Sequence, residues 1–189
     1  IEEVAHMAGR PKDPTVNQKV FNAIDDILSK QHYHDMTVDQ IANQSGVSKT
    51  TIYRRWSDKS FIIIDMFLEQ TETYKPHPVS LYDDLYQFLI HVMHIYKSNL
   101  GIAVMEILIN QYHKEAKMRF MEAYFSEKRS VLKDIIETYT TIDDEDLFID
   151  LIFSPIYFNL IIKPEVLDEA YIDKMLRLIL RMYELYHQQ

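Results

Sequence analysis

The sequence contains no cysteine, and this absence removes several kinds of chemistry. Disulfide bonds, thiolate nucleophiles and cysteine-ligated zinc sites are excluded, and the composition is typical of a reducing compartment, which we expect to be the cytoplasm. Glycine is scarce as well, since it occurs only at Gly9, Gly46 and Gly101. Three glycines so far apart cannot form a phosphate-binding loop or a dinucleotide-binding fingerprint.

Long hydrophobic runs are also missing. No apolar run approaches the ~20 residues that cross a bilayer, and no N-terminal segment has the pattern of a secretion signal. The longest candidate, LIFSPIYFNLII over 151–162, is short and interrupted by Ser154, Pro155 and Asn159. We therefore expect no membrane partner. Residues 1–6, which precede Met7, are interpreted as a remnant of expression.

The charge of the chain is negative but unevenly distributed. The formal net charge is -9, and all of it arises beyond residue 60, because residues 1–60 contain as many basic as acidic side chains. The segment 49–59 is locally basic, with Lys49, Arg54, Arg55 and Lys59 against Asp58. A local basic surface on an acidic protein favours selective docking on nucleic acid over indiscriminate binding.

The hydrophobic periodicity is helical nearly everywhere and no segment is a convincing strand, so we predict an all-α fold. Thr37 and Gln40 have the spacing of a capping box. Gly46 tolerates the left-handed backbone that ends a helix, and Ser48 and Ser57 are expected to cap the helices that follow them. The first helices are expected at about 15–30, 37–46, 48–56 and 58–73.

A proline-containing linker, YKPHPVS from Tyr74, separates these helices from the rest of the chain. Gly101 is expected to end the first helix beyond the linker, and Pro155 to bend a later one. The expected helices are 80–98, 102–112, 114–140, 141–162 and 168–186. We predict an N-terminal arm over 1–14, a three-helix domain over 15–60 and a larger helical domain over 61–189.

The two short helices joined by QSGVS form a helix-turn-helix. Val47, Ile52 and Trp56 are expected to face the core of this small domain, which leaves the opposite side of the third helix free to enter the major groove of B-DNA. Lys49 can donate hydrogen bonds to guanine. Lys59 and the free amides at the start of the fourth helix can bind a phosphate. The predicted DNA contacts are Thr37, Ser48, Lys49, Thr50, Thr51, Tyr53, Arg54, Arg55 and Lys59.

The stretch MTVDQIANQSGVSKTTIYRRWSDKSFI, within a match of roughly residues 15–65, resembles the DNA-binding domain of the TetR family of one-component transcriptional regulators. The resemblance lies in a threonine that opens the second helix, in Ala42 and Gly46, in GVS before the recognition helix, and in Tyr53, Trp56 and Lys59. The preceding GRPK is similar to the basic arm of these proteins, so Arg10 and Lys12 are candidates for minor-groove contacts. Many relatives have Tyr or His beside Phe where this chain has RRW, and an operator therefore cannot be transferred from them.

One helix-turn-helix contacts few bases, whereas two copies on a two-fold axis contact two successive half-sites. Residues 147–162 are apolar almost all round, and the last helix has a nearly equally wide apolar surface. We therefore predict a homodimer through the helices 143–162 and 168–187, packed as a four-helix bundle. The alternative is that both helices are central in a monomer. The family resemblance also implies the dimer.

The part of the chain beyond residue 60 contains 11 of the 13 tyrosines and 7 of the 9 methionines. These residues suit a pocket for a bulky lipophilic or aromatic ligand, including a cationic one bound through ring faces. For each candidate, ordinary core packing is the alternative. The candidate lining residues are Tyr86, Met93, Met105, Ile109, Tyr112, Phe120, Tyr124 and Tyr157.

No spacing of serine, histidine and carboxylate indicates a nucleophile with its base, and we expect no enzyme activity, cofactor or metal. The pairs His91 with His94 and His32 with His34 are interpreted as ordinary histidines that do not bind a metal. The resemblance implies a repressor that a small-molecule effector releases from a palindromic double-stranded DNA operator. Two alternatives stay open: an activator or architectural DNA-binding protein without a ligand, and a helical lipid-binding protein or enzyme.

Overall fold

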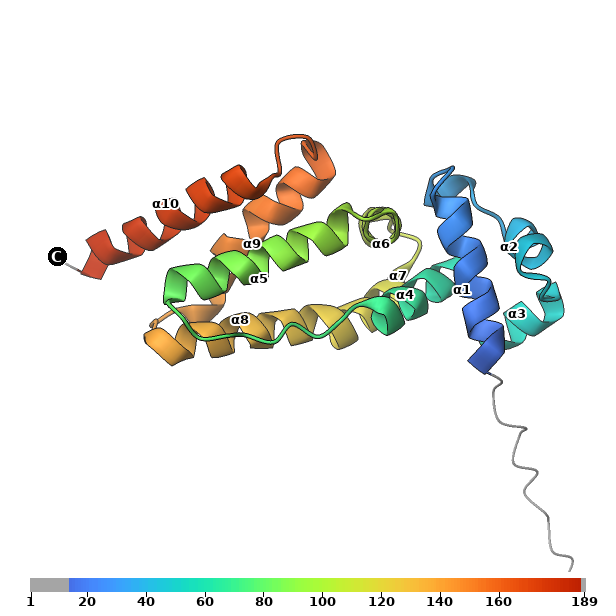
Figure 1. Ribbon diagram of the computed structural model, residues 1–189, viewed down its shortest axis with the longest axis horizontal. Coiled ribbons are helices and arrows are strands. Elements are labelled where there is room, and N and C mark those ends of the chain that lie inside the picture. The colour runs from blue at the N-terminus through green and yellow to red at the C-terminus, as the bar shows by residue number, and fades with distance from the viewer. Residues whose placement is uncertain (1–13, 188–189) are drawn as a thin grey trace, which may run out of the picture.

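The computed structural model describes residues 14–187, and every regular element in that range is helical. Residues 1–6 and the arm with Arg10 and Lys12 lie outside the described residues. Figure 1 shows a small N-terminal unit at one end of the molecule and a longer bundle of helices beside it. The predicted all-α fold is confirmed.

The N-terminal unit consists of α1 (Pro14–Leu28), α2 (Val38–Ser45) and α3 (Lys49–Arg55), with a short 3-10 turn, η1 (Tyr33–Asp35), between the first two. Its core contains the buried side chains of Phe21, Ile24, Ile41, Ile52 and Trp56. Because the apolar positions of the short helices all point into this core, their polar positions face outward.

Helix α4 (Lys59–Gln70) joins this unit to the bundle. The expectation that Ser57 caps it is wrong, because Asp58 is the cap and accepts a hydrogen bond from the Ser60 amide at 2.6 Å. The helix also ends earlier than Thr73. At Thr71 the backbone is extended, and the hydroxyl donates to the Phe67 carbonyl oxygen at 2.6 Å.

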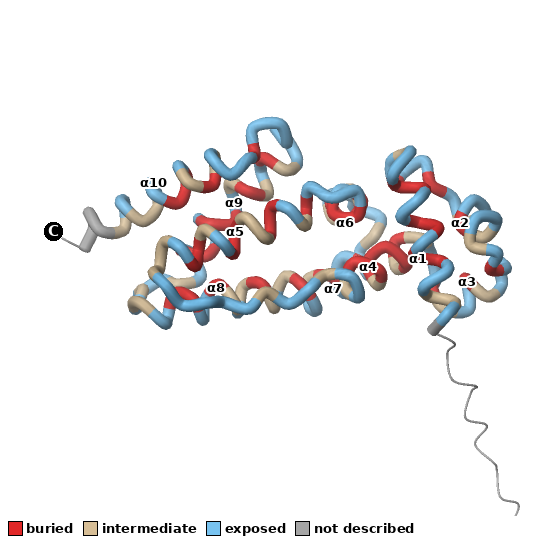
Figure 2. Tube along the Cα trace, in the orientation of Figure 1, coloured by how far each residue is buried: buried red, intermediate tan, exposed pale blue. Residues whose placement is uncertain are grey.

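The bundle consists of the remaining helices. The expected helix over 114–140 is continuous but includes a π-helical turn, η2 (Met121–Phe125), between two α-helical parts. The helices are α5 (Leu81–Lys97), α6 (Asn99–Ile109), α7 (Lys114–Phe120), α8 (Ser126–Tyr139), α9 (Glu145–Ile162) and α10 (Glu169–His187). Figure 2 shows buried residues along α4 and α5 and a largely exposed outer side of α10.

Gly101 does not end α5 as expected but lies in the first turn of α6. Its amide donates to the hydroxyl of Ser98 at 3.0 Å, and Ser98 itself is extended and separates the two helices. A Cβ atom at position 101 would lie 2.2 Å from the Ile95 carbonyl oxygen and 2.6 Å from the Tyr96 Cα. The glycine is therefore needed for the close approach of α6 to the end of α5.

Between residues 14 and 187, no single helix is long and apolar enough to cross a membrane. Only α5 and α6 taken together meet that condition, and they are bent by 82° relative to each other. Most of their apolar side chains, including Leu85, Phe88 and Ile107, are buried in the core, whereas Ile102 and Ile109 are exposed.

Candidate nucleic-acid interface

The helix-turn-helix is fixed by local hydrogen bonds that the sequence pattern predicts. The hydroxyl of Thr37 accepts from the Gln40 amide at 3.2 Å, and the Gln40 side chain accepts from the Thr37 amide at 2.8 Å, which completes a capping box. Gly46 ends α2 with φ of 67°. Because a residue with a side chain is strained in this left-handed region, the turn depends on glycine.

Ser48 begins α3 as expected. Its hydroxyl accepts from the Thr51 amide at 3.3 Å and lies 2.9 Å from the Thr51 hydroxyl. Val47 and Ile52 are buried, so they hold α3 in one rotation about its axis. This rotation decides which side chains face away from the protein.

The outward face of α3 contains Thr50, Tyr53 and Arg54, all exposed, and the Tyr53 side chain is 52% accessible. No described residue forms an ion pair or hydrogen bond with the Arg54 guanidinium. Lys49 lies at the start of the same face, but its ammonium group pairs with Asp39 at 2.9 Å, which raises the pKa of the lysine. Contact between Lys49 and DNA therefore requires exchange of this ion pair.

Two of the predicted DNA-contacting cations point toward the protein. Arg55 donates to the side chain of Asn17 at 2.7 Å and so ties α3 to α1. The Lys59 ammonium donates to three carbonyl oxygens of the loop before α2, those of Tyr33 (2.8 Å), His34 (3.2 Å) and Met36 (2.6 Å). It also lies 4.4 Å from the centre of the Tyr33 ring, and burial lowers its pKa. In this arrangement Lys59 holds the loop, and its charge does not face the outer side of α3.

The N-terminal unit contacts the bundle at several places, and carboxylates take part in two of these contacts. The first contact runs through Asp65 of α4. The Trp56 indole donates to Asp65 at 2.8 Å, and the other carboxylate oxygen of Asp65 forms an ion pair with Arg119 of α7 at 2.6 Å. Residue 56 directly follows α3, so this contact joins the end of the predicted recognition helix to the bundle.

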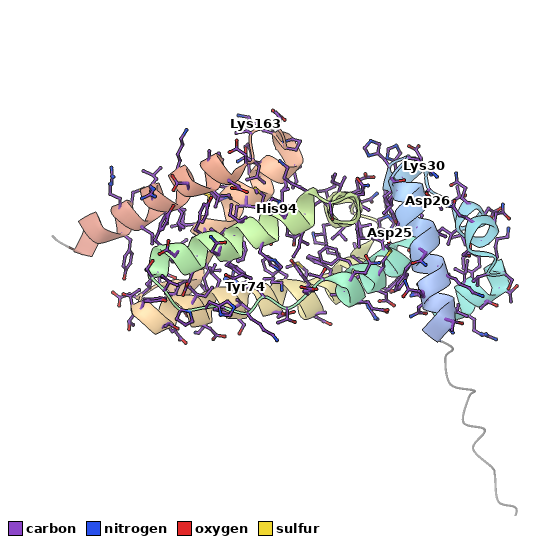
Figure 3. The ribbon with its side chains drawn as sticks, in the orientation of Figure 1. Asp25, Asp26, Lys30, Tyr74, His94 and Lys163 are labelled. Atoms are coloured by element: carbon purple, nitrogen blue, oxygen red, sulfur yellow. The ribbon has the colours of Figure 1, made fainter. Side chains whose placement is uncertain are left out.

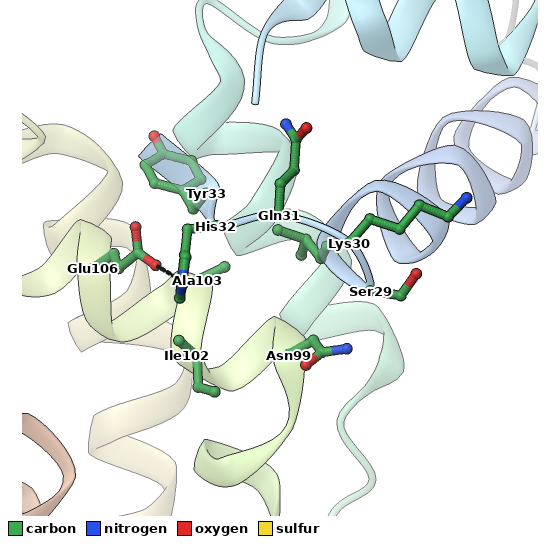
Figure 4. Close-up of a pocket in the computed structure, with 10 residues that line it drawn as sticks. Ser29, Lys30, Gln31, His32, Tyr33, Asn99, Ile102, Ala103 and Glu106 are labelled. Atoms are coloured by element: carbon green, nitrogen blue, oxygen red, sulfur yellow. Dashed lines mark ion pairs between the residues drawn. The ribbon is translucent and has the colours of Figure 1, made fainter. Parts of the chain in front are cut away.

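The second contact joins η1 and the residue before it to α6. His32 and His34 stack at 5.8 Å between ring centres, and they approach Glu106 at 3.4 and 3.3 Å. The carboxylate also accepts from the His34 amide at 3.2 Å. A cavity of about 220 Å³ lies between the end of α1 and α6. Figure 4 shows Glu106 among the residues that line it.

The structure brings some of the predicted ligand-binding residues together in the bundle. Phe120 and Tyr124 have ring centres 5.2 Å apart, and Tyr96 lies 6.1 Å from Tyr124 and 5.5 Å from Tyr157. Phe67 of α4 packs edge-on against Tyr124 at 4.8 Å. We call Phe67, Tyr96, Phe120, Tyr124 and Tyr157 the aromatic cluster. Through Phe67 the cluster includes part of α4, the helix that joins the bundle to the N-terminal unit.

The other candidate lining residues are buried in the core or lie away from the aromatic cluster. Met93 and Met105 are buried, whereas Ile109 and Tyr112 are 60% and 83% exposed at the turn between α6 and α7. Tyr86 stacks on Tyr82 at 5.9 Å, and the Tyr82 hydroxyl donates to Asp173 of α10. Ile109, Tyr112 and Tyr86 therefore lie outside the aromatic cluster.

Helices α9 and α10 expose large apolar side chains. The exposed positions follow one side of each helix, as the spacing of four residues between Leu147 and Leu151 and between Leu178 and Met182 indicates. A hollow of about 530 Å³ lies between these two helices. The exposed residues are Leu147, Leu151, Phe158, Ile161, Ile162, Leu178 and Met182.

Comparisons with known proteins agree with this geometry. The model of the bacterial regulatory proteins of the tetR family matches residues 21–65, which include the whole helix-turn-helix. The HTH-type transcriptional regulator YdeS of Bacillus subtilis is 27% identical over 173 residues, which cover 87% of each chain. The helix-turn-helix of this chain is that of the TetR family of transcriptional regulators.

Solved structures of TetR proteins have the same fold. A TetR regulator from Agrobacterium tumefaciens aligns with a TM-score of 0.68 and 17% identity over 89% of this chain and 94% of its own. MexZ of Pseudomonas aeruginosa, described as a repressor, aligns with a TM-score of 0.61 and 16% identity over 89% of this chain and 94% of its own. As expected, the family identifies a DNA-binding regulator rather than an enzyme.

The residues that join the two parts of the molecule could not be identified from the sequence pattern. Nothing in the sequence distinguishes Glu106 from the other acidic residues, but its side chain is only 24% exposed and pairs with both His32 and His34. Asp65 and Arg119 were not singled out at all. The one available signal was an acidic residue at position 65 in the otherwise apolar stretch FIIIDMF.

Proposed function

We propose that the protein is a repressor that binds a palindromic operator as a homodimer and leaves it when a small apolar effector binds inside the bundle. The observation that supports this most is the outward face of α3, where Thr50, Tyr53 and Arg54 are exposed beside buried Ile52. A helix presented in this way fits the major groove. Residues 15–60 act as the DNA-binding domain, and residues 61–189 as the effector-binding and dimerisation domain.

Direct contacts are assigned from the geometry of each side chain. Arg54 and Tyr53 are free to reach bases or phosphates, and Lys49 reaches guanine after it leaves Asp39. Thr37 and Ser48 stand at the exposed starts of α2 and α3, where amides and hydroxyls suit phosphates. Arg55 and Lys59 support the domain instead, through Asn17 and the η1 carbonyl oxygens.

The dimer forms through the exposed apolar sides of α9 and α10. Seven large apolar side chains would otherwise remain in water, and their burial against a second copy is favourable at roughly 25 cal/mol for each Å². A two-fold interface of these helices gives a four-helix bundle and places one α3 on each side of the axis. MexZ, with the same fold, is a repressor, which supports the assignment of repression.

The effector acts through α4. Phe67 of this helix touches Tyr124 in the aromatic cluster, and Asp65 of the same helix binds the Trp56 indole at the end of α3. A ligand that displaces Tyr124 therefore shifts Phe67, and the shift reaches α3 through two residues of one rigid helix. Release from DNA requires that the effector bind the displaced arrangement more tightly than the DNA-bound one.

Selection of bound sequences from random duplex DNA tests the proposal. We expect enrichment of a palindrome, and a duplex with one half-site should bind much more weakly. The double variant Leu151→Glu, Leu178→Glu should sediment as a monomer and lose the palindrome, whereas Val79→Glu, at an exposed position outside α9 and α10, should remain a dimer. Enrichment of non-palindromic sites by a monomer would contradict the proposal.

A further inference from the structure

A charged side chain is buried in the bundle almost without a partner. Lys128 of α8 is 1% exposed, although lysine is rarely buried unless it is paired. Among the described residues its ammonium group has one hydrogen-bond acceptor, a carboxylate oxygen of Glu127 at 3.4 Å, and the Glu127 side chain is 40% exposed. An ammonium group has three donors, so most of the hydrogen-bonding capacity of Lys128 is unused.

Two more buried polar atoms near α8 lack a partner in the described part of the chain. These are the hydroxyl oxygen of Tyr124 and Nε2 of His91. The Lys128 ammonium lies 4.9 Å from the centre of the Tyr124 ring. Burial lowers the pKa of His91, and the positive charge of Lys128 lowers it further. The His91 side chain is half-buried and packs against Tyr74, which Figure 3 labels on the linker before α5.

The backbone beside these groups is irregular. The π-helical turn Met121–Phe125 contains Tyr124 and ends three residues before Lys128, and the Ser126 hydroxyl donates to the Met121 carbonyl oxygen at 2.9 Å. Single π-helical turns occur often at functional sites because they redirect side chains. Here the turn directs Tyr124 into the aromatic cluster, with Phe67 and Phe120 within 5.8 Å of one another.

We propose that Lys128 and the Tyr124 hydroxyl bind the acidic group of an apolar organic acid, whose hydrocarbon part lies against the aromatic cluster. This inference rests on the proposed function, because it names the chemical class of the effector. An anion supplies the acceptors that Lys128 and Tyr124 lack, whereas a cation would meet a buried positive charge. The expectation of a cationic ligand bound through ring faces is therefore not retained.

Two fluorescent probes with the same rings test the charge preference. Binding of 8-anilinonaphthalene-1-sulfonate, an apolar anion, is compared with that of N-phenyl-1-naphthylamine, which lacks the sulfonate. We expect the anion to bind at least about tenfold more tightly, the factor that one charge-assisted hydrogen bond supplies. Lys128→Met should remove this preference. Lys133→Met, at an exposed lysine of the same helix, is the matched control and should keep it. Equal affinities in the wild type, or a preference that survives Lys128→Met, would overturn the proposal.

Further measurements keep the test valid if Lys128→Met fails to fold. They also distinguish the failure of the anion site from the failure of the proposed regulatory function. Lys128→Arg should keep the preference and Lys128→Gln should lose it. In the wild type, decanoate should displace the anionic probe while decan-1-ol at the same concentration should not, and displacement by both alike would count against an anion site. If the preference depends on Lys128 but the anion leaves operator binding unchanged, the site stands and the regulatory role fails. If a palindrome is bound and other compounds release it without any dependence on Lys128, the regulatory role stands and the anion site fails.

Discussion

Replacement of Lys59 by methionine separates a structural role of this lysine from contact with DNA. The variant keeps the length of the side chain but removes the donors to the carbonyl oxygens of Tyr33, His34 and Met36. Hydrogen bonds from a charged donor contribute about 1.5–3 kcal/mol each when they are buried. Because Lys59 is partly exposed, we discount the three together to about 2–3 kcal/mol. For a chain of this size that loss lowers the melting temperature by roughly 4–12 °C.

The assay combines thermal unfolding with operator binding at several salt concentrations. If Lys59 holds the loop, the melting temperature falls and the slope of log affinity against log salt stays unchanged. A phosphate contact would instead reduce that slope by about 0.9 with little loss of stability. Lys30→Met is the control, because Lys30 forms only an exposed ion pair with Asp26 and should change neither quantity by much. An unchanged melting temperature together with a reduced slope would refute the structural role.

Four further changes follow from the same contacts. Arg54→Ala should weaken operator binding by about 1–2 kcal/mol in a mobility-shift titration, and unchanged affinity would exclude Arg54 from the interface. Asp39→Asn should strengthen binding, because it frees Lys49 and removes a negative charge beside DNA; weaker binding would contradict this. Gly101→Ala should destabilise the fold by at least about 2 kcal/mol in denaturant unfolding, since its Cβ meets the α5 backbone. The pKa of His91 is lower in the folded than in the unfolded state, so the unfolded state binds a proton first as the pH falls below ~6.5. The free energy of unfolding should therefore decrease as the pH falls toward the folded-state pKa, and His91→Gln should flatten that part of the plot of stability against pH.

The helix-turn-helix could be predicted because its geometry depends on residues close together in sequence. Thr37 with Gln40, Gly46 and Ser48 act within one turn of the positions that they cap, so their spacing alone predicts their roles. The exposed sides of α9 and α10 follow from periodicity in the same way. A helix with apolar residues all round has more apolar surface than one neighbour covers.

The roles of long or isolated side chains could not be predicted, because they depend on which distant segment lies beside them. The sequence predicts that Lys59 and Arg54 are both exposed cations. In the structure the Lys59 ammonium group binds a loop 23 to 26 residues earlier in the chain, whereas the Arg54 side chain faces outward. Glu106 meets His34 across 72 residues of sequence. Glycine is typical of helix ends, and only the packing of α6 on α5 explains why Gly101 lies inside a helix.

Chemical footprinting of the dimer on its selected operator tests the central claim most directly. Dimethyl sulfate methylates guanine N7 in the major groove and adenine N3 in the minor groove, so it distinguishes the two grooves. We predict two patches of protected guanine N7 on one face of the duplex, with centres about 10 base pairs or a multiple of that apart. In the Arg54→Ala variant, protection from methylation should decrease in both patches together. A single patch, or protection confined to adenine N3, would contradict the entry of one α3 from each protomer into the major groove.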